Sequence, residues 1–205
     1  MKPGEEPGQV FHYQTYGMNI LTHALAVLYD LYDVQDPERL PGCGQLIKDR
    51  IRNPIAGIWT YNYTNFDLHS NARLNIFGHY TQIRSTARDT ARIGWLWLNY
   101  GHWNGQQVVP ENYLRAATQT NDFIKASEPE EKWGYGHGFW VNDYGVQWPD
   151  LPRDSFAAQG AGAKMTWVCP SLDLVITQNP GPWNAFEGDE RDERVREIWA
   201  GSSTL

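Results

Sequence analysis

Cysteine is scarce in this chain of 205 residues, which contains only Cys43 and Cys169. The two are far apart and neither belongs to a CxxC pair, so the sequence gives no sign of a thiol-based metal or redox motif. Spacing alone does not decide whether they form a disulfide with each other. No function that depends on clustered cysteines is therefore expected.

Long apolar runs and clustered basic residues are also missing. No stretch of about 18 apolar residues occurs, which excludes a membrane-spanning helix. The formal net charge is −7, and phosphate binding needs clustered Lys and Arg, so no nucleic-acid partner is expected. The acidic stretch Glu187–Glu197 is interleaved with Arg and is typical of a solvated helix face. The polar, turn-prone start Met1–Glu6 contains no signal peptide and is interpreted as a surface loop inside a longer protein.

Self-contained catalytic motifs are absent too. HExxH, GxSxG, the Walker loop and GxGxxG do not occur, which excludes simple zinc-protease, α/β-hydrolase, P-loop and Rossmann interpretations. No cofactor is expected. Asp67, His69 and His79 carry metal-ligating groups, but nothing in their spacing enforces a metal site, and we interpret them as polar loop residues.

What the chain does contain is enough apolar material for a core. Its apolar fraction is 41%, with 10 Trp and 11 Tyr, which is typical of a folded protein, and its length suits one domain. Residues 1–133 are predicted to be mainly helical with a long aromatic loop. Residues 134–205 are predicted to form antiparallel strands and a C-terminal helix ending near Ala200. Together they predict a single α+β domain.

Apolar spacing and stop signals define the first helices. A helix is predicted over 16–32, followed by a short helix over 45–52. The buried stripe of the first helix is predicted to be Leu21, Leu25, Leu28 and Tyr32. Residues 53–83 have no clean period and are interpreted as a long ordered loop.

The next helix has the clearest local signals. Thr86 and Asp89 form an acidic capping pair at its start, and Gly101 is expected to end it. Its buried stripe is predicted to be Ala87, Ala91, Trp95 and Leu98, widened by Ile93 and Trp97. Pro110 then opens a helix over 111–118, at the position where proline is best tolerated.

Sequence patterns typical of β-strands begin after Gly134. Strands are predicted over 136–141, 161–169 and 172–177. The short turn at Pro170 and Ser171 makes the last two strands antiparallel neighbours.

Four segments carry motif-like patterns in a fixed order between about residues 7 and 178. In this sequence they are Pro7–Tyr13 with Asn19–Leu21, Ser85–Gly94 (STARDTARIG), Tyr135–Val141 (YGHGFWV), and Phe156–Ala163 with Val168–Val175. They resemble, in turn, the P-G-x-x-F-x-Y-S-N segment, the S-A-x-D-x-A-R-x-G helix, the G-Y-G-x-G-(W/F) strand, and the third catalytic motif with its V-x-P-x-x-D-L-V hairpin. These motifs are those of serine hydrolases of the β-lactamase and penicillin-binding-protein type. The resemblance implies an incomplete β-lactamase-like (DD-peptidase-like) fold.

The chemistry implied by this resemblance is acyl transfer to a serine. A serine in S-x-x-K attacks a carbonyl, a lysine and a tyrosine handle its proton, and two backbone N–H groups hold the oxyanion. Tyr13 falls on the tyrosine of the Y-x-N motif, where it would act as the proton shuttle. Thr15 falls where the family usually has Asn, and its hydroxyl lacks the two-pronged hydrogen bonding of an amide for positioning a substrate.

The third motif is matched by Ala158, Gln159 and Gly160, at the place of K-T-G or H-x-G. The usual cation is missing at Ala158, which favours a neutral ester or amide as the small-molecule substrate. Gly160 would let the strand backbone approach a ligand closely. Ala161 would donate one of the N–H groups to the oxyanion.

The serine-bearing motif itself is missing. The residues three positions before Lys48, Lys125, Lys132 and Lys164 are Gln45, Asp122, Pro129 and Ala161, and Lys2 has none, so no S-x-x-K exists. In the family this motif precedes the tyrosine. Without the accompanying strands, a sheet edge and the apolar face of Trp167, Val168, Leu174 and Ile176 would be exposed. We therefore expect a homo-oligomer or a companion N-terminal fragment.

Two other interpretations remain open at this stage. A non-catalytic relative that binds a ligand or partner is favoured by Thr15 and Ala158, which both depart from the family motifs. A carbohydrate-active protein is suggested by the aromatic stretch 59–80, since rings stack on sugar faces. Glycosidase chemistry would also need two suitably separated carboxylates, and Asp67, Asp89 and Asp143 form no motif.

Overall fold

The computed structural model describes residues 6, 9–13, 15–31, 43–66, 76–160 and 164–179. The chain divides into two compact units. One comprises His12–Asp89, and the other comprises Met1–Phe11 with Thr90–Leu205. The helix expected near Ala200 lies outside the described residues.

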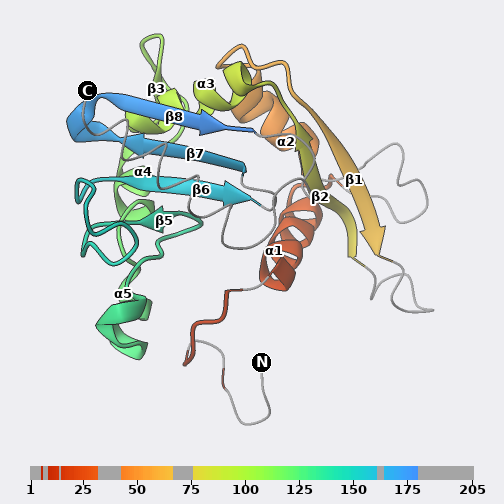
Figure 1. The fold of residues 1–205 in the computed structure, drawn as a ribbon. Coiled ribbons are helices and arrows are strands. Elements are labelled where there is room, and N and C mark those ends of the chain that lie inside the picture. The colour runs from red at the N-terminus through yellow and green to blue at the C-terminus, as the bar shows by residue number, and fades with distance from the viewer. Residues whose placement is uncertain are drawn as a thin grey trace. The chain divides into compact units, whose positions relative to one another are not determined.

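The unit His12–Asp89 combines helices with a β-hairpin (Figure 1). Its elements are α1 (Thr15–Leu28), α2 (Gly44–Ile47), the π-helical turn η1 (Lys48–Arg52), β1 (Thr60–Phe66) and β2 (Ile76–Arg84). The last two pair antiparallel, so the expected long loop over 53–83 was wrong. Tyr and Thr favour strands, but the register shifts at Asn62/Tyr63 and Thr64/Phe66, and such irregularities interrupt the alternation that sequence patterns rely on.

The first helix forms close to the predicted range, but its predicted stripe was wrong. Leu21 and Leu28 are 51% and 73% exposed, whereas Ala26 is fully buried. Tyr32 lies outside the described residues. The helix carries apolar side chains on several sides, Met18 among them, so spacing alone could not identify the buried face. Among the described residues, no helix is both long and apolar enough to cross a bilayer.

The start of α3 (Ala87–Leu98) confirms the predicted capping pair. Thr86 Oγ1 accepts a hydrogen bond from Asp89 N at 3.2 Å and donates one to Asp89 Oδ2 at 3.0 Å. Asp89 is 2% exposed, and its Oδ1 accepts a hydrogen bond from Ile58 N at 3.0 Å, which ties the helix start to the segment before β1. At the other end Gly101, at φ +86°, donates from its N–H to Leu96 O at 2.8 Å, as a helix stop requires.

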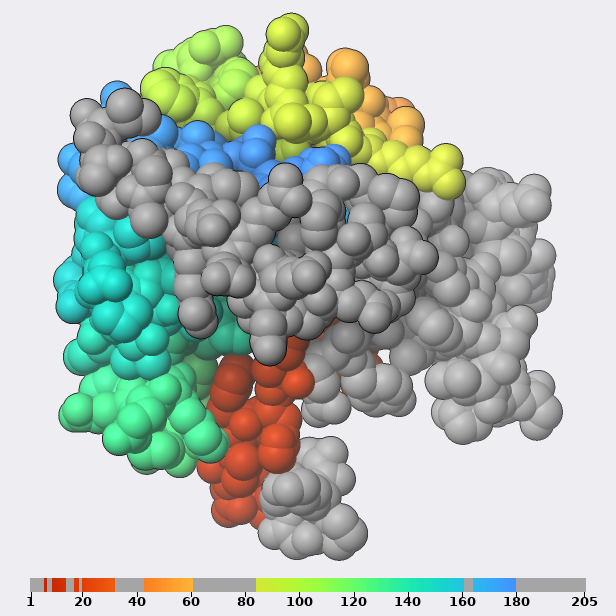
Figure 2. Space-filling view, viewed as in Figure 1, coloured from red at the N-terminus to blue at the C-terminus, as the bar shows by residue number. Residues whose placement is uncertain are grey.

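The buried face of α3 differs from the predicted stripe. Trp95 is 47% exposed and Ala87 is exposed, contrary to the prediction. Leu98 is buried as predicted, and Leu96 is buried although it was not predicted. The decisive residue is Gly94: a Cβ there would lie 2.4 Å from Val175 Cγ1 and 2.9 Å from Thr166 Cγ2. The missing side chain lets the helix approach the sheet closely. Because a glycine has no apolar side chain, the apolar pattern could not predict this contact. Figure 2 shows α3 and β8 surfaces adjoining.

The second unit is built on a four-stranded antiparallel sheet. Its strands, in spatial order, are β5 (Trp140–Val141), β6 (Phe156–Gly160), β7 (Lys164–Cys169) and β8 (Leu174–Gln178). The predicted hairpin of the last two strands is confirmed, with the short helix η4 (Pro170–Leu172) as its turn. β6 was not predicted as a separate strand. The strand expected over 136–141 is shorter, because residues 136–138 lie in the turn that leads into it.

The remaining elements of this unit are short. They are β3 (His102–Trp103), β4 (Gln106–Gln107), α4 (Glu111–Ala117), α5 (Asp122–Ser127) and the 3-10 helix η3 (Glu130–Lys132). Pro110 stands directly before α4, as predicted. Asn121 caps α5, because its side chain accepts a hydrogen bond from Phe123 N at 2.8 Å.

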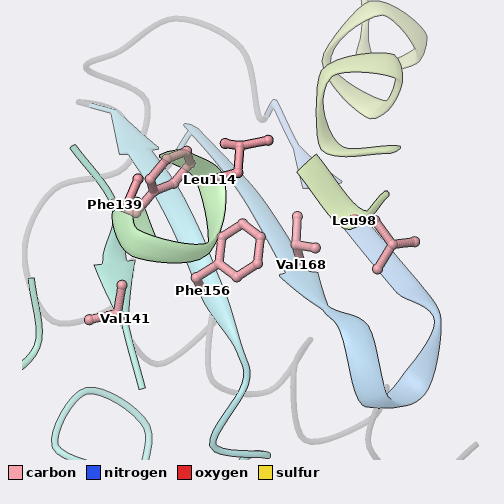
Figure 3. Close-up of a cluster of buried hydrophobic side chains, with 7 residues drawn as sticks. Leu98, Leu114, Phe139, Val141, Phe156 and Val168 are labelled. Carbon is pink, nitrogen blue, oxygen red and sulfur yellow. The ribbon is translucent and has the colours of Figure 1, made fainter. Parts of the chain in front are cut away.

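Apolar side chains cover both faces of the sheet. On the face that carries α3 and α4, the buried residues are Leu98, Leu114, Ala117, Phe139, Val141, Phe156 and Val168 (Figure 3). On the opposite face they are Trp148, Leu151, Ala157, Met165, Trp167 and Cys169. The expected exposure of Trp167 and Val168 was therefore wrong. Both are fully buried, because α3 and α4 cover one face and the loop carrying Trp148 packs on the other.

Candidate active site

The strand β6 carries the three residues matched to the third motif. Ala158 pairs with Thr166, Gln159 with Met165, and Gly160 with Lys164 across the ladder to β7 (Figure 1). The strand is buried at Phe156 and becomes exposed at Gln159 and Gly160. The motif thus lies where a well-packed strand reaches an accessible end. Ala161, the predicted oxyanion donor, lies outside the described residues.

Among the described residues, a side chain at Gly160 would meet only ordinary contacts. A Cβ built on it would meet Lys164 Cβ at 3.7 Å and Lys164 O at 3.9 Å, both ordinary contact distances. Packing among the described residues therefore does not require glycine here. The predicted reason for glycine, close approach of a ligand to the strand backbone, stays a prediction.

Tyr13 and Thr15 stand at the beginning of the first helix. Thr15 is the first residue of α1, and Tyr13 precedes it with 60% of its surface exposed. This pair belongs to the unit His12–Asp89, whereas Ala158, Gln159 and Gly160 belong to the unit that contains Thr90–Leu205. Within each group the residues are neighbours in the sequence, and the role of each residue stays a prediction.

The glycine-rich segment before β5 forms a tight turn lined by aromatic rings. Gly136 N donates to Phe139 O at 2.8 Å, and Tyr135 forms a bridge with Trp140. The rings of those two residues lie 5.1 Å apart, and Phe11 lies 5.5 Å from Tyr135. Since Trp140 pairs with Ala157, this row of rings borders the motif strand.

Two of the carboxylates considered for glycosidase chemistry accept structural hydrogen bonds instead. Asp89 is buried at the cap of α3, and Asp143 accepts hydrogen bonds from Thr120 N at 2.9 Å and Thr120 Oγ1 at 2.6 Å. Trp59 is 2% exposed, so this ring offers no stacking surface. Within the described ranges no cluster of three or more His, Cys, Asp or Glu could hold a metal ion, and Asp67 lies outside them.

Neither cysteine provides a substitute nucleophile. Both are buried and neither forms a disulfide. Burial raises the pKa of the Cys43 thiol, which donates a hydrogen bond to Thr22 O at 2.8 Å. The Cys169 thiol is fully buried and lies 3.6 Å from Asp154 Oδ1. A thiolate is the reactive form, and a buried neutral thiol is chemically inert.

The comparisons with known proteins agree with these motifs. The family model described as Beta-lactamase matches residues 1–179. This chain belongs to the β-lactamase family. A protein of Bacillus anthracis assigned as a 6-aminohexanoate-dimer hydrolase shares 19% identity with a TM-score of 0.69, over 96% of this chain and 44% of that protein. A protein of Bacteroides dorei DSM 17855 assigned as a β-lactamase shares 14% identity with a TM-score of 0.57, over 93% of this chain and 59% of that protein.

The fold is therefore α+β and β-lactamase-like, as the sequence resemblance implied. The chain spans about half the length of the solved structures that it matches. None of the curated proteins matches it. Membership of the β-lactamase family relates the chain to the serine hydrolases in general.

Sequence reasoning missed two residues near the motif strand. Lys164 was considered only as the lysine of an S-x-x-K motif, because its pairing with Gly160 depends on strand register, which the sequence did not give. Asn142 follows β5, is fully buried and hydrogen-bonds the loop that leads to β6. A weak signal existed for the lysine, since it is the only charged residue of the segment 155–172.

Proposed function

We propose that this chain forms part of a serine hydrolase that transfers the acyl group of an ester or amide. The observation that carries the proposal is the motif strand: Ala158, Gln159 and Gly160 end β6 at an accessible point, in a chain of the β-lactamase family. Exposed backbone at the end of a rigid strand suits an oxyanion site, because its N–H groups are held in fixed positions.

The proposed reaction has two steps. A serine from an S-x-x-K segment outside this sequence attacks the carbonyl carbon, while Tyr13 accepts the serine proton and passes it to the leaving alcohol or amine. The carbon–oxygen or carbon–nitrogen bond of the substrate breaks as the acyl-serine bond forms. Water then attacks the acyl-serine and releases the acid. Ala161 N–H would stabilise the oxyanion, and Thr15 would hydrogen-bond the substrate.

The proposed substrate class is an ester or an amide without further specification of the leaving group. The Bacillus anthracis protein of similar fold is named for hydrolysis of a 6-aminohexanoate dimer, which supports an amide among the candidates. The row formed by Phe11, Tyr135 and Trp140 offers an apolar surface beside the motif strand for the acyl or leaving group.

Covalent labelling tests the proposal. After addition of a polypeptide that carries the S-x-x-K segment, we expect a fluorophosphonate probe to label the serine of the reconstituted protein. Tyr13→Phe should slow the labelling about 100-fold or more, because the proton acceptor is removed. Tyr113→Phe, at a 51% exposed tyrosine of α4, is the matched control and should label at the normal rate. Failure of the reconstituted protein to label would contradict the proposal.

We propose further that the chain associates with a companion N-terminal fragment or with a second copy of itself. Apolar side chains of α1 support association, since Met18, Ile20 and Leu21 are each about half exposed. Light scattering should show self-association of the isolated chain, and adding the fragment should convert it to a defined complex. A clean monomer of high thermal stability would contradict this expectation.

A non-catalytic relative that binds a ligand or partner is the second candidate function. The departures from the family motifs favour it, since Ala158 and Thr15 replace a cation and an amide. The same labelling experiment separates the two functions. Ligand binding without labelling would favour the binding protein, and an S-x-x-K in the natural upstream sequence would favour the enzyme.

A further inference from the structure

A polar pocket lies at the end of β6 opposite to the motif residues. Its volume is about 310 Å³, at the lower end of the range for small-molecule sites. Phe156 is the first residue of β6 and lines the pocket, whereas Gly160 is the last residue of the strand. At a rise of about 3.3 Å per residue, the two ends lie roughly 13 Å apart. The polar and aromatic residues that share the pocket wall with Phe156 are Tyr100, Arg115, Asp143, Arg153 and Asp154.

Two carboxylates line this pocket, and each is held by a backbone N–H and a hydroxyl group. Asp143 accepts hydrogen bonds from Thr120 N at 2.9 Å and Thr120 Oγ1 at 2.6 Å. Asp154 accepts them from Ser171 N at 2.6 Å and Ser171 Oγ at 2.9 Å. These donors are uncharged, so the bonds orient both carboxylates without neutralising them. A carboxylate has about four lone-pair sites, so each one can accept a further hydrogen bond from a ligand.

The first of two guanidinium groups in the pocket has a carboxylate partner. Arg115 pairs with Glu111 at 2.8 Å, one turn earlier on α4. Its guanidinium also lies over the ring of Tyr100, 3.8 Å from the ring centroid. The charge of Arg115 is therefore balanced within α4.

The second guanidinium group is fixed in place but has no carboxylate partner. Arg153 Nη1 donates to Pro149 O at 3.2 Å, and the guanidinium lies against Gly145, where a side chain would collide with it. Within the described part of the chain Arg153 forms no ion pair, although Asp143 and Asp154 line the same pocket. Opposite charges thus share one pocket, each oriented by its own contacts and held apart from the others.

We propose that this pocket binds a small zwitterion of the amino-acid class. The carboxylate of the ligand binds Arg153, and its ammonium group binds Asp143 and Asp154. A ligand with only a negative charge would face two carboxylates, and a ligand with only a positive charge would leave Arg153 without a partner, so the pocket selects a ligand that carries both. The inference goes beyond the proposed hydrolase function, because none of the pocket residues belongs to the acyl-transfer site.

Two backbone amides allow binding at this pocket to be measured directly. Thr120 N–H donates to Asp143 and Ser171 N–H donates to Asp154, so ¹⁵N NMR of the chain detects a ligand at either carboxylate. The probes are linear amino acids from glycine to 6-aminohexanoate, with the simple carboxylate and the simple amine of each chain length. At least one amino acid should shift both amides and bind about tenfold more tightly than its matched carboxylate and amine.

Substitution of Arg153 tests the charge assignment. Arg153→Gln should weaken binding of the amino acid about tenfold, to the affinity of the matched amine, because the partner of the ligand carboxylate is removed. Arg153→Lys keeps the charge and should still bind the amino acid more tightly than the amine. Lys132→Gln is the matched control, since it removes a positive charge that pairs with Glu128 outside the pocket, and it should leave the affinity unchanged.

Three results would overturn the inference. They are binding of none of the amino acids, equal affinity of amino acid and amine in the wild-type chain, and unchanged affinity in Arg153→Gln. Shifts confined to the amides of Gln159 and Gly160 would also overturn it, because they would place the ligand at the motif residues. Failure of serine labelling would instead contradict the proposed function, since the binding measurement involves no serine.

Discussion

Asn142→Asp is expected to lower the free energy of unfolding by about 3–5 kcal/mol, the cost of an uncompensated buried charge. Asn142 is fully buried, and its Nδ2 donates to Trp148 O at 2.9 Å, Leu151 O at 3.1 Å and Pro152 O at 3.1 Å. Its Oδ1 accepts a hydrogen bond from Trp148 N at 2.8 Å. The substitution keeps the shape but removes the donors and places a negative charge against three carbonyl oxygens.

Urea denaturation at two pH values gives the decisive measurement. Burial raises the pKa of the introduced carboxyl group in the folded state, so its neutral form is favoured as the pH falls and the loss should be larger at pH 8 than at pH 5. Asn99→Asp is the matched control, because Asn99 is exposed and its Nδ2 donates to Trp95 O at 2.8 Å. It should cost less than about 1 kcal/mol. Equal losses for the two variants would contradict the role assigned to Asn142.

Gly136→Ala should lower the free energy of unfolding by about 3 kcal/mol or more, at the upper end of overpacking effects. A Cβ on Gly136 would lie 2.1 Å from Ala117 O and 2.6 Å from Gln119 O, and both are backbone atoms. Backbone cannot rotate away as a side chain can. The chain must shift, which breaks the hydrogen bond from His137 N to Ala117 O at 3.0 Å.

Gly138→Ala, two residues further along the same turn, distinguishes crowding from backbone conformation. Gly138 has φ +87°, and no atom of the described residues lies within 4 Å of a Cβ built on it, so alanine there carries only the free-energy cost of the left-handed backbone, about 1–2 kcal/mol. In thermal unfolding, the Tm of Gly136→Ala should be well below the Tm of Gly138→Ala. The reverse order would show that Gly136 is not confined by α4.

The parts of the fold that the sequence predicted well depend on local signals. The ends of α3 followed from Thr86 with Asp89 and from Gly101, because capping groups act within one turn of the helix. The hairpin of β7 and β8 followed from the short turn at Pro170. Such features need no knowledge of distant residues.

The parts that failed depend on contacts between distant segments. The buried face of α3 is chosen by Gly94 against Val175, and apolar periodicity carries no information about a missing side chain. The β1–β2 hairpin was not predicted, because its register shifts interrupt the alternation of side chains that indicates a strand. At the site, the sequence selected Ala158 to Gly160, whose roles stay predictions, but it did not give the strand register that sets Gly160 opposite Lys164. Asn142 was missed because its burial depends on the loop through Trp148, and the sequence around it is typical of a polar loop.

The restraint on Asn142 has a consequence for chemical ageing. Loss of ammonia from an asparagine requires its amide carbon to meet the next backbone nitrogen, and the bonds to Trp148, Leu151 and Pro152 hold the amide in one orientation. Unfolding releases that amide. A molecule that deamidates while unfolded carries a carboxylate at position 142, which the folded loop does not accommodate. Prolonged heating should therefore convert reversible unfolding into irreversible loss of the folded protein.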